Sequence, residues 1–232
     1  MDNDINFETY LFIGLKKIII SVYSESNKII YEKILLIEDD QKKLDFDKLD
    51  HFLNENIFKI EKLIKNFINK IFIILNVDEF LSIELSIKNN SYENKLISKN
   101  LNHLLKEAKD CCNETIEKKK IIHMIILNYN VDGKNYSFFP NNPGNSIISL
   151  DIKFITLSSN FIKKLEEILK KYHISLNQLV SANYINEFLK DDDNIFLMTK
   201  KILQGHNPNE VILINKMTRN KGFFEKFFDF FS

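Results

Sequence analysis

Apolar and polar residues in the first third of the chain alternate in a way that predicts several strands and one long helix. Runs rich in β-branched residues occur at Leu11–Ile13, Ile18–Val22 and Ile29–Ile37, separated by short polar breaks, as in a three-stranded meander. From Leu49 to Ile68 the apolar positions recur every three or four residues, with lysines and glutamates between them. This spacing predicts an amphipathic helix whose apolar face lies on the sheet.

Two further strands follow this helix. Residues 70–77 are almost continuously apolar, which predicts a buried strand, and strict alternation from Leu81 to Ile87 predicts a half-exposed one. We group both strands with the meander in a first unit, residues 1–88.

A second unit is expected over residues 89–190. It begins near Ser98, a plausible helix N-cap, and contains the turn signal Asp132-Gly133 between two strand patterns. Ser159 is a plausible cap for its next helix. Its expected helices lie at 98–112, 159–172 and 184–189, and its expected strands at 121–131, 136–139, 147–157 and 176–180.

The C-terminal forty residues have a different character. Residues 191–221 predict a partly ordered tether that contains one short helix at 194–203 and one short strand at 211–214. Residues 222–232 then predict an amphipathic helix, whose rings span about 160° of the helix surface opposite charged side chains. Its phenylalanines are Phe223, Phe224, Phe227, Phe228, Phe230 and Phe231.

This terminal helix has two interpretations. The first is insertion at a membrane interface, with Lys216, Arg219 and Lys221 close to anionic lipid headgroups. Binding by a single copy would be weak, so self-association would strengthen it. The alternative is docking in a groove of the chain's own fold.

Charge and hydropathy exclude several classes of protein. Thirty-two basic and 32 acidic residues give a net charge of zero, so the chain has no basic field suited to nucleic acid. The start of the chain is acidic and polar, unlike a secretory signal, and no apolar run approaches the roughly 18 residues that span a bilayer. We therefore expect a peripheral protein on the cytoplasmic face of the cell membrane.

Groups that could perform catalysis are scattered. The five histidines have no metal-ligand spacing and lie beside no nucleophile motif, and the five glycines are too dispersed to form a phosphate cradle. Cys111 and Cys112 are adjacent in a helical pattern, where one of them would pack inward. The sequence predicts no catalytic residue, no metal site, no bound cofactor and no enzyme activity.

One stretch resembles a known family. Residues Ile121–Gly133 combine an aliphatic–His–aliphatic start with Tyr129 and a final Asp-Gly, the pattern of the SHS2 insertion in the bacterial cell-division protein FtsA. The same alignment continues without a gap and matches that family at Pro140, at Thr156 and at Leu179–Ala182. The resemblance covers about residues 10–190 and extends to the C-terminal phenylalanine helix. It implies an α+β protein with a partial actin-like (ribonuclease H-like) N-terminal sheet and helix followed by an SHS2 domain.

The chain departs from the family at the phosphate loop. Leu11–Lys17 stands where the family has L-D-I-G-T-S-K, so the loop residues are Phe12, Gly14, Leu15, Lys16 and Lys17, without the carboxylate or the hydroxyl. The resemblance therefore implies a degenerate loop that binds no nucleotide. The second lobe that binds FtsZ has no counterpart here, so FtsZ contact does not carry over.

The resemblance implies a cell-division adaptor. The SHS2 domain would contact division proteins or further copies of the chain, and residues 222–232 would bind an anionic membrane. One alternative is a PilM-like cytoplasmic platform of a pilus or secretion system. Another is a degenerate actin-like ATPase in which Lys16 or Lys17 binds phosphate.

Overall fold

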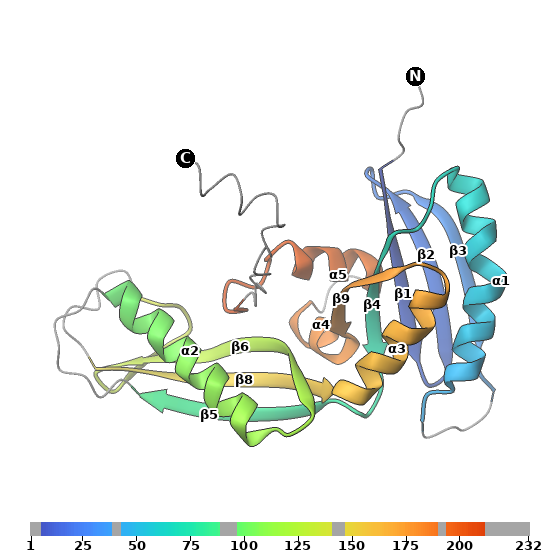
Figure 1. The fold of residues 1–232 in the computed structure, drawn as a ribbon. Helices are drawn as coiled ribbons and strands as arrows, with labels where there is room; N and C mark the ends of the chain where they lie inside the picture. Colours follow the sequence, from blue (N-terminus) through green and yellow to red (C-terminus); the bar gives the residue numbers. More distant parts are fainter. Residues whose placement is uncertain (1–5, 39–42, 89–96, 141–146, 190–193, 212–232) are drawn as a thin grey trace, which may run out of the picture.

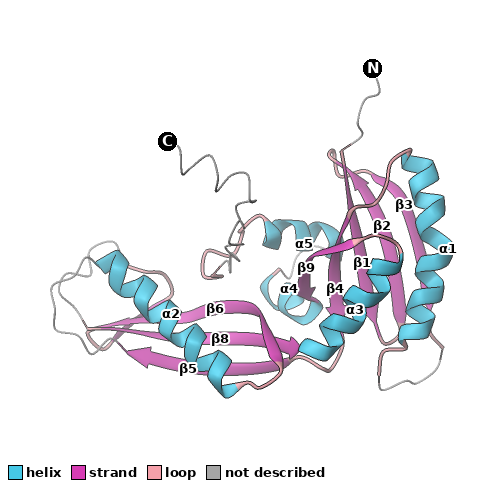
Figure 2. Cartoon of the chain, viewed as in Figure 1, coloured by secondary structure: helices cyan, strands magenta, loops and turns pink. Residues whose placement is uncertain are grey.

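The computed structural model describes residues 6–38, 43–88, 97–140, 147–189 and 194–211, and only the backbone of residues 97–100. In these ranges nine strands form two sheets, and five helices pack against them (Figures 1 and 2). The two sheets lie at opposite ends of an elongated molecule, with helices α4 and α5 between them in the view of Figure 1.

The first sheet has five strands in the order β3-β2-β1-β4-β9. Strands β1, β2 and β3 form an antiparallel meander, and β4 and β9 run parallel to β1. The predicted α+β class and the predicted N-terminal meander are confirmed by this arrangement. The strands are β1 (Phe7–Gly14), β2 (Lys17–Ser24), β3 (Ile29–Leu36), β4 (Lys70–Asn76) and β9 (Ser175–Ser181).

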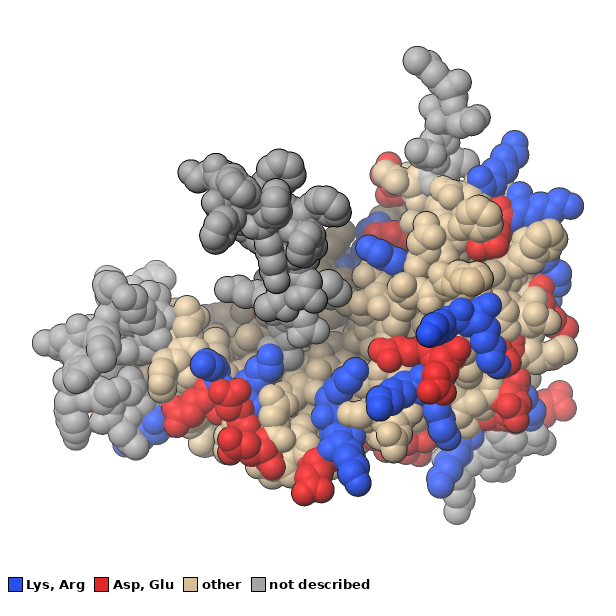
Figure 3. Space-filling model, viewed as in Figure 1, with Lys and Arg blue, Asp and Glu red and all other residues tan. Residues whose placement is uncertain are grey.

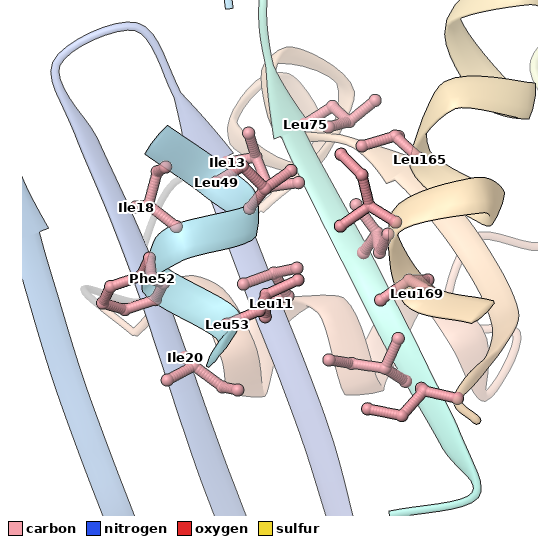
Figure 4. Packing of buried hydrophobic residues seen from close by; sticks show 14 of the residues in the cluster. Leu11, Ile13, Ile18, Ile20, Leu49, Phe52, Leu53, Leu75, Leu165 and Leu169 are labelled. Atoms are coloured by element: carbon pink, nitrogen blue, oxygen red, sulfur yellow. The ribbon is translucent and has the colours of Figure 1, made fainter. Parts of the chain in front are cut away.

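Helices α1 (Phe46–Ile64) and α3 (Ser159–Lys171) cover one face of this sheet (Figure 4). The Asp45 carboxylate accepts hydrogen bonds from the amides of Asp47 and Lys48, which fixes the start of α1. The apolar spacing predicted from Leu49 becomes the buried face of α1 as far as Ile64, where the helix ends. Leu63 and Phe67, which also fit the predicted spacing, are exposed. Ser159 is the first residue of α3 rather than its cap, and Ser158 in the cap position makes no side-chain cap bond.

Helices α4 (Ala182–Phe188) and α5 (Ile195–Leu203) contribute to a second core on the other face of the sheet. The centroid of the Tyr10 ring lies within 6.0 Å of the ring centroids of Tyr23, Phe72 and Phe196. The predicted helix at 194–203 is confirmed, but residues 194–211 are not a tether. Met198 and Ile202 are buried with Phe196, because the apolar face of α5 packs on an aromatic surface of the sheet.

The second sheet is antiparallel and has the order β5-β8-β6-β7. Helix α2 (Ile97–Thr115) packs on one face of it, and Cys112 is buried there while Cys111 is exposed, as predicted. Asp132 and Gly133 form the turn between β6 and β7 with positive φ angles. The strands are β5 (Leu81–Lys88), β6 (Lys119–Val131), β7 (Lys134–Tyr136) and β8 (Ile148–Ser158).

Two strands lie in a different sheet from the one expected. Strand β5, grouped with the first unit in the sequence, pairs with β8 of the second sheet, and β9, grouped with the second unit, pairs with β4 of the first. Helix α3 also packs on the first sheet. The division into residues 1–88 and 89–190 therefore does not coincide with the two sheets. The second sheet is an insertion between β4 and α3 of the first.

An ion pair between α1 and α3 gives the fold a measurable pH dependence. Lys171 binds the Asp50 carboxylate, and the Tyr172 hydroxyl donates to Asp50 Oδ1 at 2.8 Å. The hydrogen bond from Lys171 is the main cause that lowers the pKa of Asp50, while burial and then Asp50 raise the pKa of Tyr172 to about 12.

We expect Asp50→Asn to lower the free energy of unfolding at pH 7 by about 1 kcal/mol. A carboxylate whose folded pKa is below its unfolded pKa stabilises the fold above the unfolded pKa, and this contribution disappears as the pH falls through the folded pKa. The difference between variant and wild type should therefore begin to shrink below about pH 4 and continue to shrink as the pH falls further. Urea unfolding at several pH values measures it, with the exposed Glu167→Gln as the matched control. A difference as large at pH 2.5 as at pH 7 would contradict the assignment.

Candidate functional site

The turn between β1 and β2 contains the residues that the sequence resemblance identifies as a degenerate phosphate loop. Leu15 and Lys16 form the turn, and the Lys16 carbonyl accepts a hydrogen bond from the Ile37 amide at 2.9 Å. No carboxylate or hydroxyl side chain is present between Phe12 and Lys17. The turn therefore lacks the groups that would hold a magnesium ion or its bound water.

The Phe12 ring fills the space beside this turn. It is buried with Ile74, and a Cβ placed on Gly14 would lie 3.0 Å from the ring. The Lys17 ammonium lies 5.5 Å from the ring centroid, a cation–π contact. Phe12, which the resemblance aligns with an aspartate, is therefore part of the apolar core. Lys16 is exposed.

A cleft of about 520 Å³ lies between the two sheets, and we call it the inter-sheet cleft. Its walls come from the start of β6, from β9, from the C-terminal end of α5 with the segment that follows it to Val211, and from α2. Lys109, Lys119 and Lys120 contribute positive charge to it, and Ile121, Leu179 and Leu203 contribute apolar surface. On the face that Figure 3 shows, basic and acidic side chains are mixed.

Two strand edges face this cleft. Strand β9 is the last strand of its sheet, so its outer edge has no partner strand among the described residues. The outer edge of β6 pairs with β7 only from Tyr129 to Val131, which leaves its first half open apart from one contact near Ile125. Open strand edges bind extended segments through backbone hydrogen bonds.

A buried polar network links the elements around the cleft. His123 on β6 is 4% exposed, and its Nδ1 lies 2.7 Å from Oε1 of Glu210. The Ser181 amide donates to His123 Nε2 at 3.1 Å. Because Nε2 accepts a hydrogen bond, the proton of the neutral ring is on Nδ1, where it is donated to Glu210.

Tyr184 completes this network. Its hydroxyl donates to Glu210 Oε2 at 2.7 Å and accepts from Asn207 Nδ2 at 2.8 Å, and its ring lies 4.5 Å from the imidazole of His123. Burial is the main cause that raises the pKa of Tyr184; the Asn207 bond lowers it and Glu210 raises it. Both ring nitrogens of His123 have a hydrogen-bond partner, and the network joins β6 to the end of β9 and to Glu210. Neither ring nitrogen is therefore free to act as a base.

Sequence reasoning placed His123 in a strand and assigned it a structural or solvent-exposed position, and its burial confirms the structural one. It did not single out Glu210, Tyr184 or Asn207. The other histidines do not join the network. His51 and His103 each lie near a glutamate four residues later on an exposed helix face. Among the described residues no cluster of three His, Cys, Asp or Glu could hold a metal ion.

The predicted membrane-binding residues lie outside the described residues. These are Lys216, Arg219, Lys221, Phe223, Phe224, Phe227, Phe228, Phe230 and Phe231. Within the described part of the chain, no helix is long and apolar enough to cross a membrane.

Comparison with known proteins gives fold likenesses alone. No family model and no curated protein matches the chain. A chain of a PilM–PilN type IV pilus biogenesis complex is similar over 78% of this chain and 49% of its own length, at 8% identity and a TM-score of 0.47. The cytoplasmic domain of EpsL, an inner membrane component of the type II secretion system of Vibrio cholerae, is similar over 78% and 57%, at 12% identity and a TM-score of 0.36. A Bacteroides thetaiotaomicron protein with an actin-like ATPase fold and unknown function is similar over 81% and 58%, at 12% identity and a TM-score of 0.34. The chain thus spans about half to three fifths of the length of these proteins.

Proposed function

We propose that this chain is a nucleotide-independent adaptor that binds an extended segment of a partner protein and holds it at the cytoplasmic face of a membrane. The observation that carries the proposal is the inter-sheet cleft, where the open edge of β9, the partly open edge of β6 and three lysines meet. A cleft that combines apolar surface with a few convergent charged groups is a reasonable default hypothesis for a binding site. The Phe12 ring beside the β1–β2 turn supports independence from nucleotide.

Two membrane-associated assemblies are candidates. We take a PilM-like cytoplasmic platform of a pilus or secretion system as the first candidate, because the inter-sheet cleft could receive an extended segment of another subunit. A division adaptor of the FtsA kind, with the second sheet as its SHS2 domain, is the second. The observation that favours it is the hairpin of β6 and β7, which contains the Ile121–Gly133 pattern.

Site-specific photo-crosslinking in cells tests the adaptor proposal. A photo-reactive residue at the exposed Gln178 of the cleft should give a crosslink to one subunit of a pilus, secretion or division assembly. The same residue at Lys59, exposed on α1, is the matched control and should give none. Mass spectrometry of the adduct distinguishes the two assemblies. Crosslinks from Lys59 alone would contradict the role of the cleft.

We expect ATP or ADP with Mg²⁺ at about 1 mM to leave the midpoint of thermal unfolding unchanged within about 1 °C. A nucleotide present at about 100 times its dissociation constant would stabilise the fold by about 2.7 kcal/mol, which shifts the midpoint of a chain of this size by about 5 °C or more. Scanning fluorimetry with an intrinsic tyrosine signal measures this. A rise above about 3 °C would favour the degenerate ATPase instead.

A further inference from the structure

The edge of β6 that faces the cleft is partly occupied by the chain itself. Residues 204–211, which we call the C-terminal strap, leave the end of α5 and run beside β6. The Ile126 amide donates to the Asn209 carbonyl at 2.9 Å, and the Val211 amide donates to the Met124 carbonyl at 2.8 Å. The strap thus forms one antiparallel bridge, centred on Ile125 and Glu210.

Side-chain hydrogen bonds add to the two backbone hydrogen bonds between the strap and β6. The Glu210 carboxylate binds His123 and Tyr184, and the Asn209 amide donates to the Ser137 carbonyl at 3.0 Å. Residues 204–206 are exposed, and Gly205 has a φ of +81° in the turn that leaves α5. On its other edge β6 pairs with β8 along almost its whole length. The strap is therefore a short, locally held strand on an otherwise open edge.

We propose that the strap is a displaceable strand that the chain supplies to itself and that regulates access to the edge of β6. This inference rests on the proposed adaptor function, because it concerns the same cleft. A partner strand that adds to β6 at Met124–Ile126 must first remove the strap. Removal also frees eight residues, up to about 28 Å of extended chain, for the segment that leads to residues 222–232. Binding of a partner would then be coupled to the reach of the C-terminal segment.

The full-length chain tests this with one backbone substitution. Val211→Pro removes the amide that binds the Met124 carbonyl, and the matched control Val211→Ala keeps it. The probe is a labelled synthetic peptide with the sequence of residues 204–214. We expect Val211→Pro to bind it at least tenfold more tightly than wild type and Val211→Ala. Hydrogen exchange of the Ile126 amide should also be at least tenfold faster in Val211→Pro, with the amides of β1 and β4 unchanged.

Three results would overturn the proposal. The first is equal affinity of all three proteins for the peptide, including no binding by any of them. The second is binding of a scrambled peptide with the same affinity. The third is loss of protection in β1 and β4 together with Ile126, because the strap would then be an integral part of the fold. A negative crosslinking result at Gln178 would instead count against the adaptor function and leave the peptide measurement intact.

Discussion

Ending the chain at Asn220 is expected to abolish its co-sedimentation with liposomes that contain anionic lipid, whereas the full chain sediments with them. The truncation removes all six phenylalanines of residues 222–232 and keeps Lys216 and Arg219. Basic residues alone contribute about 1 kcal/mol each near an anionic surface, which is too little to retain the chain at moderate salt. Sedimentation at several lipid concentrations, with the protein quantified in pellet and supernatant, measures the partition coefficient.

The expected binding is weak and reversible. Six rings that each bury on the order of 100 Å² give about 15 kcal/mol at roughly 25 cal/mol/Å². Ordering eleven residues costs about 1 kcal/mol or more each, so only a few kcal/mol remain. Replacing Phe224 and Phe228 by Ser should therefore lower the partition coefficient at least tenfold, and replacing Glu225 and Asp229 by Ser, as the matched control, should not lower it. Equal sedimentation of the full and truncated chains would instead support docking of this segment within the fold.

Most strands could be predicted from the sequence, but their partners could not. The strand expected at 136–139 is instead β7 at Lys134–Tyr136. Alternation along Leu81–Ile87 determines which side chains of β5 are half-buried, and the structure has that pattern from Ile83 onward. The same alternation fits the edge of either sheet. A two-residue repeat shows which face of a strand is buried, but it does not show which strand lies beside it. Strand β9 has the same ambiguity, and its parallel pairing with β4 follows only from the path of α3 back to the first sheet.

The two parts of the candidate site differ in the same way. The degenerate turn could be predicted residue by residue, because Phe12, Leu15 and Lys16 are adjacent in the sequence and replace groups with known chemistry. The cleft could not be predicted, because its walls come from strands of different sheets. A histidine within the apolar run of β6 signals a buried polar group that needs partners. Nothing local indicates that one of these partners is Glu210, 87 residues later.

The ordered position of the strap could not be predicted from its composition. Residues 204–209 have the residues of a loop, which predicts a tether, and only the apolar Val211 and the residues after it suggested a strand. Its position depends on side-chain bonds of Asn207, Asn209 and Glu210 to distant elements. Polar residues that are satisfied by tertiary contacts look the same in sequence as polar residues that are solvated.

We expect His123→Ala to lower the free energy of unfolding by about 3 kcal/mol, measured by urea unfolding at pH 7. The substitution leaves the Glu210 carboxylate without one of its donors and the Ser181 amide without its acceptor, and both groups are buried or nearly so. An unsatisfied buried partner costs about 1–3 kcal/mol, and more where it is charged. The removed ring also leaves a cavity against Tyr184, which adds to the loss.

Two matched variants separate the two hydrogen bonds of His123. Asn in this position can place an amide N–H near the site of Nδ1 and so retain a donor for Glu210, whereas Gln can place its carbonyl near the site of Nε2 and retain an acceptor for Ser181. Each should recover about 1 kcal/mol relative to Ala. If the network acts as a unit, the double variant His123→Ala with Glu210→Ala should lose less free energy of unfolding than the sum of the losses in the two single variants. The reason is that each single variant leaves the other buried side chain without its partner, whereas the double variant removes both. A loss below about 0.5 kcal/mol for His123→Ala would show that β6, the strap and the start of α4 are held together by apolar packing alone.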